Sequence, residues 1–368
     1  MKNLLGPLDE ELNHQTSRPF RVPATTDHRF YDRHWFELVA PHGDVALIAG
    51  MGLFKNLGVA DGFVSVQRDR RQHNVRVSRP LDDQVEACVG PLRFEIIEPF
   101  QTIRLTLDEG DHPLACDLTW TSRFPARLEA PHLDLVDARI VTDISRYDQS
   151  GSWTGWIRLG EDTIQANDWW GIRDHSWGVR PDIGGFEPSH GRRKSSTLWL
   201  WTFATTDELE CHFTLREDGH GNRLFIDGYV QRRDDLAADP VDVVDVQHEI
   251  HFIEGTRDWD VLTYRILLED GQLVTLTAEA FQSAWAYRGT GYEGGFDDGR
   301  GVGVPRGHLV EHDVLDLTVP GRVTRNGEGY HPGHREQPAR VRINGRPGQG
   351  HLPVMSSGHI ERYGLGRP

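Results

Sequence analysis

The stretch LTYRILLEDGQLVTLTA, residues 262–278, decides the fold class. Apolar side chains alternate with polar ones up to Glu269-Asp270-Gly271, and the alternation resumes beyond that turn. A period of two on both sides of an Asp-Gly turn is the strongest short-range signal of a β-hairpin. The pattern therefore predicts two antiparallel strands joined by a tight turn.

The same pattern recurs along the 368 residues, and no segment shows a sustained helical period. Many short strands joined by hairpins indicate an antiparallel all-β protein, and strands with one apolar face suit barrels. The Gly- and Pro-rich segment 180–196 breaks the pattern. We therefore expect two halves, residues 1–190 and 191–368. The further alternating runs lie at 73–79, 103–107, 114–120, 211–215 and 314–319.

The amino-acid composition argues against some classes of binding partner. Asp and Glu total 56 against 40 Lys and Arg, a formal net charge of −16. That excess argues against nucleic acid and anionic membranes, which need a basic surface. No apolar run approaches the length of a transmembrane helix, and acidic residues at 9–11 precede any signal-peptide core, so we expect a cytoplasmic protein. Three widely spaced cysteines predict neither a disulfide framework nor a cysteine zinc site.

Tryptophans gather in one part of the chain. Of the 11 in the sequence, seven lie between positions 153 and 201. One interpretation is an aromatic core shared by two sheets. The other is an aromatic-walled cavity for a large apolar ligand, whose π faces would also stabilise a cation. The seven are Trp153, Trp156, Trp169, Trp170, Trp177, Trp199 and Trp201.

The segment 167–180, NDWWGIRDHSWGVR, combines these tryptophans with charged side chains. If it is extended, Arg173, His175 and Trp177 share one face, while Asp174 and Ser176 share the other. Asp174 and His175 then cannot act on one atom unless a bulge turns one of them. The alternative is a structural network in which Asp174 and Arg173 bond backbone groups.

Arg173-Asp174-His175-Ser176-Trp177-Gly178 after a Trp-rich strand resembles the signature of the hydroxyneurosporene synthase (carotenoid 1,2-hydratase) superfamily, as does the later strand Leu198–Phe203. Weaker likenesses lie in Tyr31–Glu37 and Gly358–Gly364, so the resemblance touches both ends and the middle of the chain. It implies an all-β fold of two tandem antiparallel lipocalin-like barrels, with a hydrophobic cavity near the central motif.

The hydratase members of that superfamily add water to an alkene of a lipophilic isoprenoid without a redox cofactor. Such chemistry needs an acid in a dry site, aromatic faces for the carbocation and a positioned water. The family's His-x-Trp pair matches His175-Ser176-Trp177. Its proposed acid, an Asp in a Tyr-x-Asp pattern, has no counterpart in Trp199–Phe203. Asp174 is the substitute, because burial among tryptophans would raise its pKa.

We therefore expect a lipophilic small-molecule substrate (terpenoid or carotenoid, polyketide or steroid-like) and its acid-type hydration, isomerisation or cyclisation, with no cofactor and no metal. Asp174 would donate the proton, His175 would partner it or position water, and Arg173 would orient the substrate or Asp174. The alternatives are a non-catalytic lipophile carrier and a purely structural motif. The oligomeric state is not predicted. The expected pocket residues are Trp169, Trp170, Trp177, Trp199 and Trp201.

Three other motifs match known active-site patterns but lack the secondary structure that those patterns require. His308-Leu309-Val310-Glu311-His312 fits an inverted zincin, but that chemistry needs a helix and the following residues alternate like a strand. The glycines at 289–294 imitate a dinucleotide fingerprint without a following helix. Ser152 fits a nucleophile elbow without the α/β alternation. Most of the remaining scattered histidines, such as His212, His220, His248 and His251, are expected on the surface or in hairpins.

Overall fold

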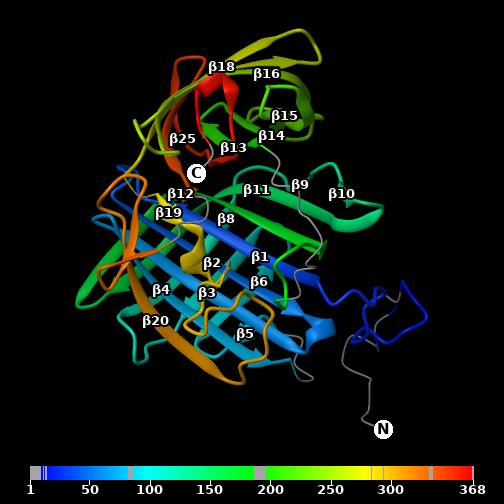
Figure 1. The fold of residues 1–368 in the computed structure, drawn as a ribbon, viewed down its shortest axis with the longest axis vertical. Helices are drawn as coiled ribbons and strands as arrows, with labels where there is room; N and C mark the ends of the chain where they lie inside the picture. Colours follow the sequence, from blue (N-terminus) through cyan, green and yellow to red (C-terminus); the bar gives the residue numbers. More distant parts are fainter. Residues whose placement is uncertain are drawn as a thin grey trace.

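The structure is a computed structural model that describes residues 10, 12, 15–81, 86–185, 196–282, 284–292, 294–330 and 335–366. Antiparallel strands make up two lobes (Figure 1). Two strands of the first lobe, β11 (Arg139–Leu159) and β12 (Asp162–Val179), lie on the side that faces the second lobe. The only helical elements within those residues are short 3-10 turns, including η2 (Lys55–Leu57), η3 (Tyr287–Thr290) and η4 (Glu361–Tyr363). The all-β prediction is thus confirmed.

The first lobe is one long antiparallel sheet that curls until β5 and β6 come back against β3 and β4. Its strands are β1 (Phe30–Val39), β2 (Val45–Phe54), β3 (Val59–Arg68), β4 (Arg71–Pro80), β5 (Cys88–Val89), β6 (Leu92–Glu98), β7 (Thr102–Leu107), β8 (Leu114–Ser122), β9 (Arg127–Leu128), β10 (His132–Val136), β11 (Arg139–Leu159), β12 (Asp162–Val179), β20 (Leu309–Asp316), β21 (Val323–Arg325) and β22 (Glu328–Tyr330).

The second lobe is a closed barrel of eight antiparallel strands, because β13 pairs with both β14 and β25. A two-stranded sheet of β19 (Trp285–Ala286) and β23 (Arg335–Glu336) stands apart. The barrel strands are β13 (Thr197–Thr206), β14 (Leu209–Asp218), β15 (Arg223–Arg232), β16 (Val241–Phe252), β17 (Trp259–Leu268), β18 (Leu273–Ala280), β24 (Pro338–Ile343) and β25 (Arg346–His351), and β26 (Val354–Ser357) also pairs with β13.

The alternating runs become the walls of two apolar cores. In β7, Ile103, Leu105 and Leu107 are buried in the first core, and the hairpin β17–β18 buries its alternate residues in the second. The predicted boundary at residue 190 lies outside the described residues. Strand β20 comes from the second half of the sequence and pairs with β4 of the first sheet, so the division of the chain stays a prediction.

Strand β20 also decides against the zincin interpretation. Residues 309–316 are extended, and Glu311 accepts from Arg76 on the face opposite to His312. Two histidines and a glutamate therefore do not converge there. Within the described part of the chain, no helix has the length and apolar character needed to cross a membrane.

Candidate acid–base site between the two lobes

The charged side chains of β12 point alternately to the two faces of the first sheet. The ladder between β11 and β12 shifts register only between Trp153 and Gly155, so no bulge occurs at 173–177. Arg173 therefore points into the first lobe, over the ring of Trp120, and His175 points the same way. Asp174 points toward the second lobe. The structure does not bring Asp174 and His175 onto one atom, which is the outcome that strand geometry alone requires.

The inward group is a chain of hydrogen bonds. His175 Nε2 lies 2.7 Å from Asp32 Oδ1, and its Nδ1 lies 3.2 Å from Tyr147 Oη. Arg173 donates to the same Tyr147 oxygen at 3.2 Å. Trp177 packs edge-on to the His175 ring and is half-exposed. These groups orient one another, and Asp32 fills the place beside His175 that was expected for Asp174.

The predicted pocket tryptophans divide in the same way. Trp169 belongs to the packed core of the first lobe. Trp170 donates to Thr205 of the second barrel and packs with Trp201 in a cluster between the lobes. Trp199 lines a small pocket beside that cluster. Part of the aromatic segment is therefore shared core, and part of it forms the walls of a pocket.

A cluster of largely buried titratable side chains lies against the outward face of β11 and β12. We call it the interface acid cluster, and its members are Glu129, Arg146, Asp148, Asp174 and His212. Asp148 and Asp174 are cross-strand neighbours in the β11–β12 ladder. Glu129, in the connection between β9 and β10, reaches His212 of β14 at 3.1 Å and accepts from Trp201 Nε1 at 3.1 Å. The cluster therefore joins both lobes.

Arg146 is the cation of this cluster. Its Nη1 lies 3.5 Å from Glu129 Oε2, and its guanidinium stacks over the ring of Trp201. His212 Nε2 also lies 3.9 Å from Asp148 Oδ2. Both carboxyl oxygens of Asp148 are buried without a hydrogen bond of normal geometry. A buried carboxyl in that state is strongly disfavoured as an anion.

Burial and the neighbouring Glu129 carboxylate raise the pKa of Asp148 well above its ordinary value, and Asp174 adds to the effect. Burial acts the same way on Glu129, but Arg146 and His212 outweigh it and hold the pKa of Glu129 below its ordinary range. Burial also raises the pKa of Asp174, against Arg146 and Arg33. The pKa values of the two carboxyls in the Glu129–Asp148 pair are thus driven apart, and Asp148 is the member that holds a proton more tightly.

The pocket beside the cluster has about 390 Å³ of free space, which includes open solvent, and its enclosed part has room for little more than one water molecule. Glu129 and Arg146 form its polar wall, and Trp199, Phe225 and Ile144 form apolar walls. Such a combination of apolar surface and few polar groups is typical of small-molecule sites. Its remaining lining residues are Ala130, His132, Thr214 and Arg216.

Most of this cluster has no local signal in the sequence. Glu129 and Asp148 stand in no motif, and they meet only because strands far apart in sequence pair. The scattered histidines are expected at the surface or in hairpins: His220 and His251 are exposed, whereas His212 and His248 are buried in the hairpins β13–β14 and β16–β17. The alternation of Arg146 and Asp148 along one strand was the one available hint.

Glu129, Asp148 and His212 each offer a ligand atom, and the three atoms lie within 4.8 Å of one another. That donor set could hold a cation. Arg146 already supplies positive charge to Glu129, however, and the protonated Asp148 would have to lose its proton first. The absence of a metal remains a prediction, and no step below uses one.

The closed eight-stranded antiparallel barrel gives the protein a lipocalin-like fold. The chain belongs to a family of unknown function (DUF8625), whose pattern matches residues 5–355. Among solved structures it is similar to a Nitrosomonas europaea protein that carries the provisional name AttH, with 12% identity, coverage of 90% of this chain and 94% of the other, and a TM-score of 0.54.

A more distant likeness is to CghA, with 12% identity, coverage of 89% of this chain and 88% of the other, and a TM-score of 0.46. CghA crystallised with Sch210972 gives a TM-score of 0.43 at the same identity and coverage. No curated protein matches the sequence. The likeness to the Nitrosomonas europaea protein supports the fold alone, and the membership of the hydroxyneurosporene synthase superfamily stays a hypothesis.

Proposed function

We propose that the protein catalyses cofactor-free acid–base isomerisation or cyclisation of an oxygenated lipophilic molecule in the pocket between its two lobes. The observation that carries the proposal is the Glu129–Asp148 pair, whose carboxyl oxygens lie within 4.8 Å of each other and whose pKa values are shifted in opposite directions, at the wall of an aromatic-lined pocket. Two carboxyl groups whose pKa values are driven apart are the usual arrangement for paired base and acid catalysis.

Each group has a distinct role in this mechanism. Glu129 faces the pocket and, as the base, takes a proton from a carbon next to a carbonyl of the substrate. Arg146, on the same wall, stabilises the negative charge that develops on the carbonyl oxygen. Glu129 then returns the proton to a different carbon. Alternatively, the enolate carbon bonds to a second electrophilic carbon and closes a ring, and the electron pair displaced from that electrophile takes the proton from Glu129.

Asp148 exchanges a proton with Glu129 between the steps of this reaction. It lies close enough to Glu129 for a proton to pass between them after a small side-chain movement. Asp174 is a positioning residue in this scheme, since its field helps to keep Asp148 protonated. Hydration of an isolated alkene is less favoured, because a carboxyl with a raised pKa is a weak acid for that demanding protonation.

The test uses deuterium, so it needs no advance knowledge of the product. Lipophiles that co-purify with the protein are extracted and identified, or a panel of unsaturated isoprenoid and polyketide ketones is supplied. Each is then incubated in D₂O with wild type, Glu129→Gln and Asp148→Asn. Wild type is expected to place deuterium on substrate carbon, and both variants to lose at least about a hundredfold of that rate, within the usual range for an acid or base.

The matched control is Asp117→Asn, an exposed carboxylate paired with Arg104 on the far strands β7 and β8. It should exchange as fast as wild type. A lipophile carrier, the alternative function, would bind the same ligands without incorporating deuterium in any variant. Equal incorporation by wild type and Glu129→Gln would remove this cluster from the mechanism.

A further inference from the structure

A second pocket lies elsewhere on the same outward face of the first sheet, and it shares no lining residue with the first. Its free space of about 260 Å³ includes open solvent, and the enclosed part has room for only about one water molecule. Strands β1, β2 and β3 form its floor, and the glycine-rich loop after η3 forms its roof. Its apolar lining includes Phe54, Phe63, Tyr292, Phe296 and Val302.

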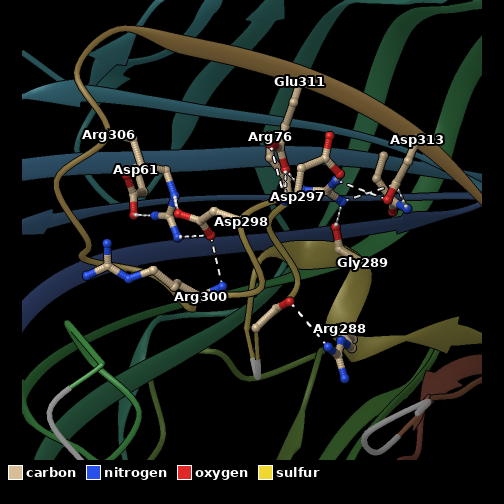
Figure 2. A network of polar contacts seen from close by, with 12 residues as sticks. Asp61, Arg76, Arg288, Gly289, Asp297, Asp298, Arg300, Arg306, Glu311 and Asp313 are labelled. Atoms are coloured by element: carbon tan, nitrogen blue, oxygen red, sulfur yellow. Dashed lines mark hydrogen bonds and ion pairs between the residues drawn. The ribbon is translucent and has the colours of Figure 1, made fainter. Parts of the chain in front are cut away.

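Ion pairs hold the roof of this pocket in place (Figure 2). Arg306 donates to Asp298 at 3.0 Å and lies 3.8 Å from Asp61 of β3. Nearby, Arg76 of β4 pairs with Glu311 at 2.6 Å and Asp313 at 3.0 Å. Buried guanidinium groups in this region are thus matched with carboxylates, as the cost of burying a lone charge requires.

Arg33 is the exception. It lines the pocket, is 7% exposed, and makes neither a hydrogen bond nor an ion pair with any residue that the structure describes. Its guanidinium lies 4.7 Å from the ring centre of Tyr292 and 5.7 Å from that of Phe63. These π faces soften the cost of burial, but they accept no N–H bond in the guanidinium plane.

Nearby carboxylates compensate for that charge only in part. Asp174 faces Arg33 from β12 beyond ion-pair distance, and burial raises the pKa of that carboxyl, which weakens its negative charge. Asp61 also lines the pocket, but it lies 3.8 Å from Arg306. Arg180 lies against Tyr292 at 4.9 Å and adds a second guanidinium beside Arg33, so an anion that reached these two groups would be attracted to them.

We propose that this pocket binds the carboxylate of a small apolar acid, with Arg33 as its anchor. A guanidinium offers two parallel N–H donors that match a carboxylate. The aromatic walls suit the apolar part of such an acid, which would lie at the open side of the pocket. The site is independent of the proposed acid–base site, and its failure would leave that proposal standing.

Calorimetric titration of the full chain tests the proposal with benzoate, benzamide and acetate as probes. Benzoate should bind wild type, and benzamide, which lacks the charge, should bind at least about tenfold more weakly. Acetate, which lacks the ring, should also bind more weakly. Arg33→Met should weaken benzoate binding at least about tenfold, while Arg104→Met, at an exposed arginine of β7, should leave it unchanged.

A second readout separates a binding role from a structural one. Because Arg33 has no partner, Arg33→Met should unfold at the same temperature as wild type or higher, and benzoate should raise the melting temperature of wild type alone. If Arg33→Met fails to fold, Arg33→Lys keeps the charge and should bind benzoate with intermediate affinity. Equal binding of benzoate and benzamide, or no binding of benzoate to wild type, would overturn the proposal.

Discussion

His351 makes a charged contact that ties the second barrel to the first sheet. It is fully buried at the end of β25, with Nδ1 2.8 Å from Glu37 Oε2 and Nε2 2.9 Å from Glu336 Oε2. Burial by itself would lower the pKa of His351, but the two carboxylates outweigh it and raise that pKa to about 10. His351 is therefore an imidazolium throughout the neutral range, and its charge stabilises the folded state.

The sign of the pH dependence follows from that direction. The stabilisation is fully present below about pH 6.5, where the unfolded histidine is also charged, and it is lost as the pH rises toward about 10. A shift from 6.5 to about 10 corresponds to roughly 5 kcal/mol at about 1.4 kcal/mol per pH unit. Removing one partner of a buried pair costs about 3–5 kcal/mol, so we expect His351→Gln to lose that much near neutral pH.

Urea denaturation of wild type and His351→Gln at about pH 6 and about pH 10 measures this effect. The difference in free energy of unfolding between the two proteins should be large at the lower pH and should shrink by more than half at the higher. His220→Gln is the control, because His220 pairs with Glu361 on the exposed surface and should change stability little at either pH. An equal difference at both pH values would refute the account of His351.

Three further predictions rest on single contacts. Burial raises the pKa of Asp61 to about 6, so its ionised form destabilises the fold above that pH, and Asp61→Asn should raise the free energy of unfolding in urea at pH 7 by about 1–3 kcal/mol. Gly171→Ala should lower it by about 2–4 kcal/mol, because the new Cβ would lie 2.2 Å from the Glu37 carbonyl oxygen and 2.4 Å from the Trp153 ring. Trp199→Leu should weaken binding of the co-purifying lipophile about tenfold, measured by fluorescence titration, with little change in melting temperature.

The local part of this fold could be predicted from the sequence, because hairpin strands carry their pairing signal in neighbouring residues. Alternation placed Leu262, Tyr264 and Ile266 inside a barrel and separated Asp174 from His175. The pairing of β20 with β4 could not be predicted in this way. Its strands lie more than two hundred residues apart, and no local pattern specifies which edge a strand will join.

The candidate site was predicted only in part for the same reason. The aromatic segment did mark the junction of the lobes, where Trp170 and Trp201 pack together. Asp174 is a member of the interface acid cluster, but the sequence could not show that Asp148 lies opposite to it. Glu129 and His212 meet across two lobes, and their contact depends on tertiary packing rather than on any spacing along the chain.

The protonation state of Asp148 tests the central claim most directly, and it needs no substrate. Infrared spectra of wild type and Asp148→Asn at pH 7 isolate the C=O stretch of a protonated carboxyl, with Asp117→Asn as control. The account predicts a protonated-carboxyl band that Asp148→Asn loses and Asp117→Asn retains, because burial and Glu129 hold the pKa of Asp148 well above its ordinary value. If Asp148→Asn removes only carboxylate bands, Asp148 is ionised at rest, and the proposed acid–base pair does not exist.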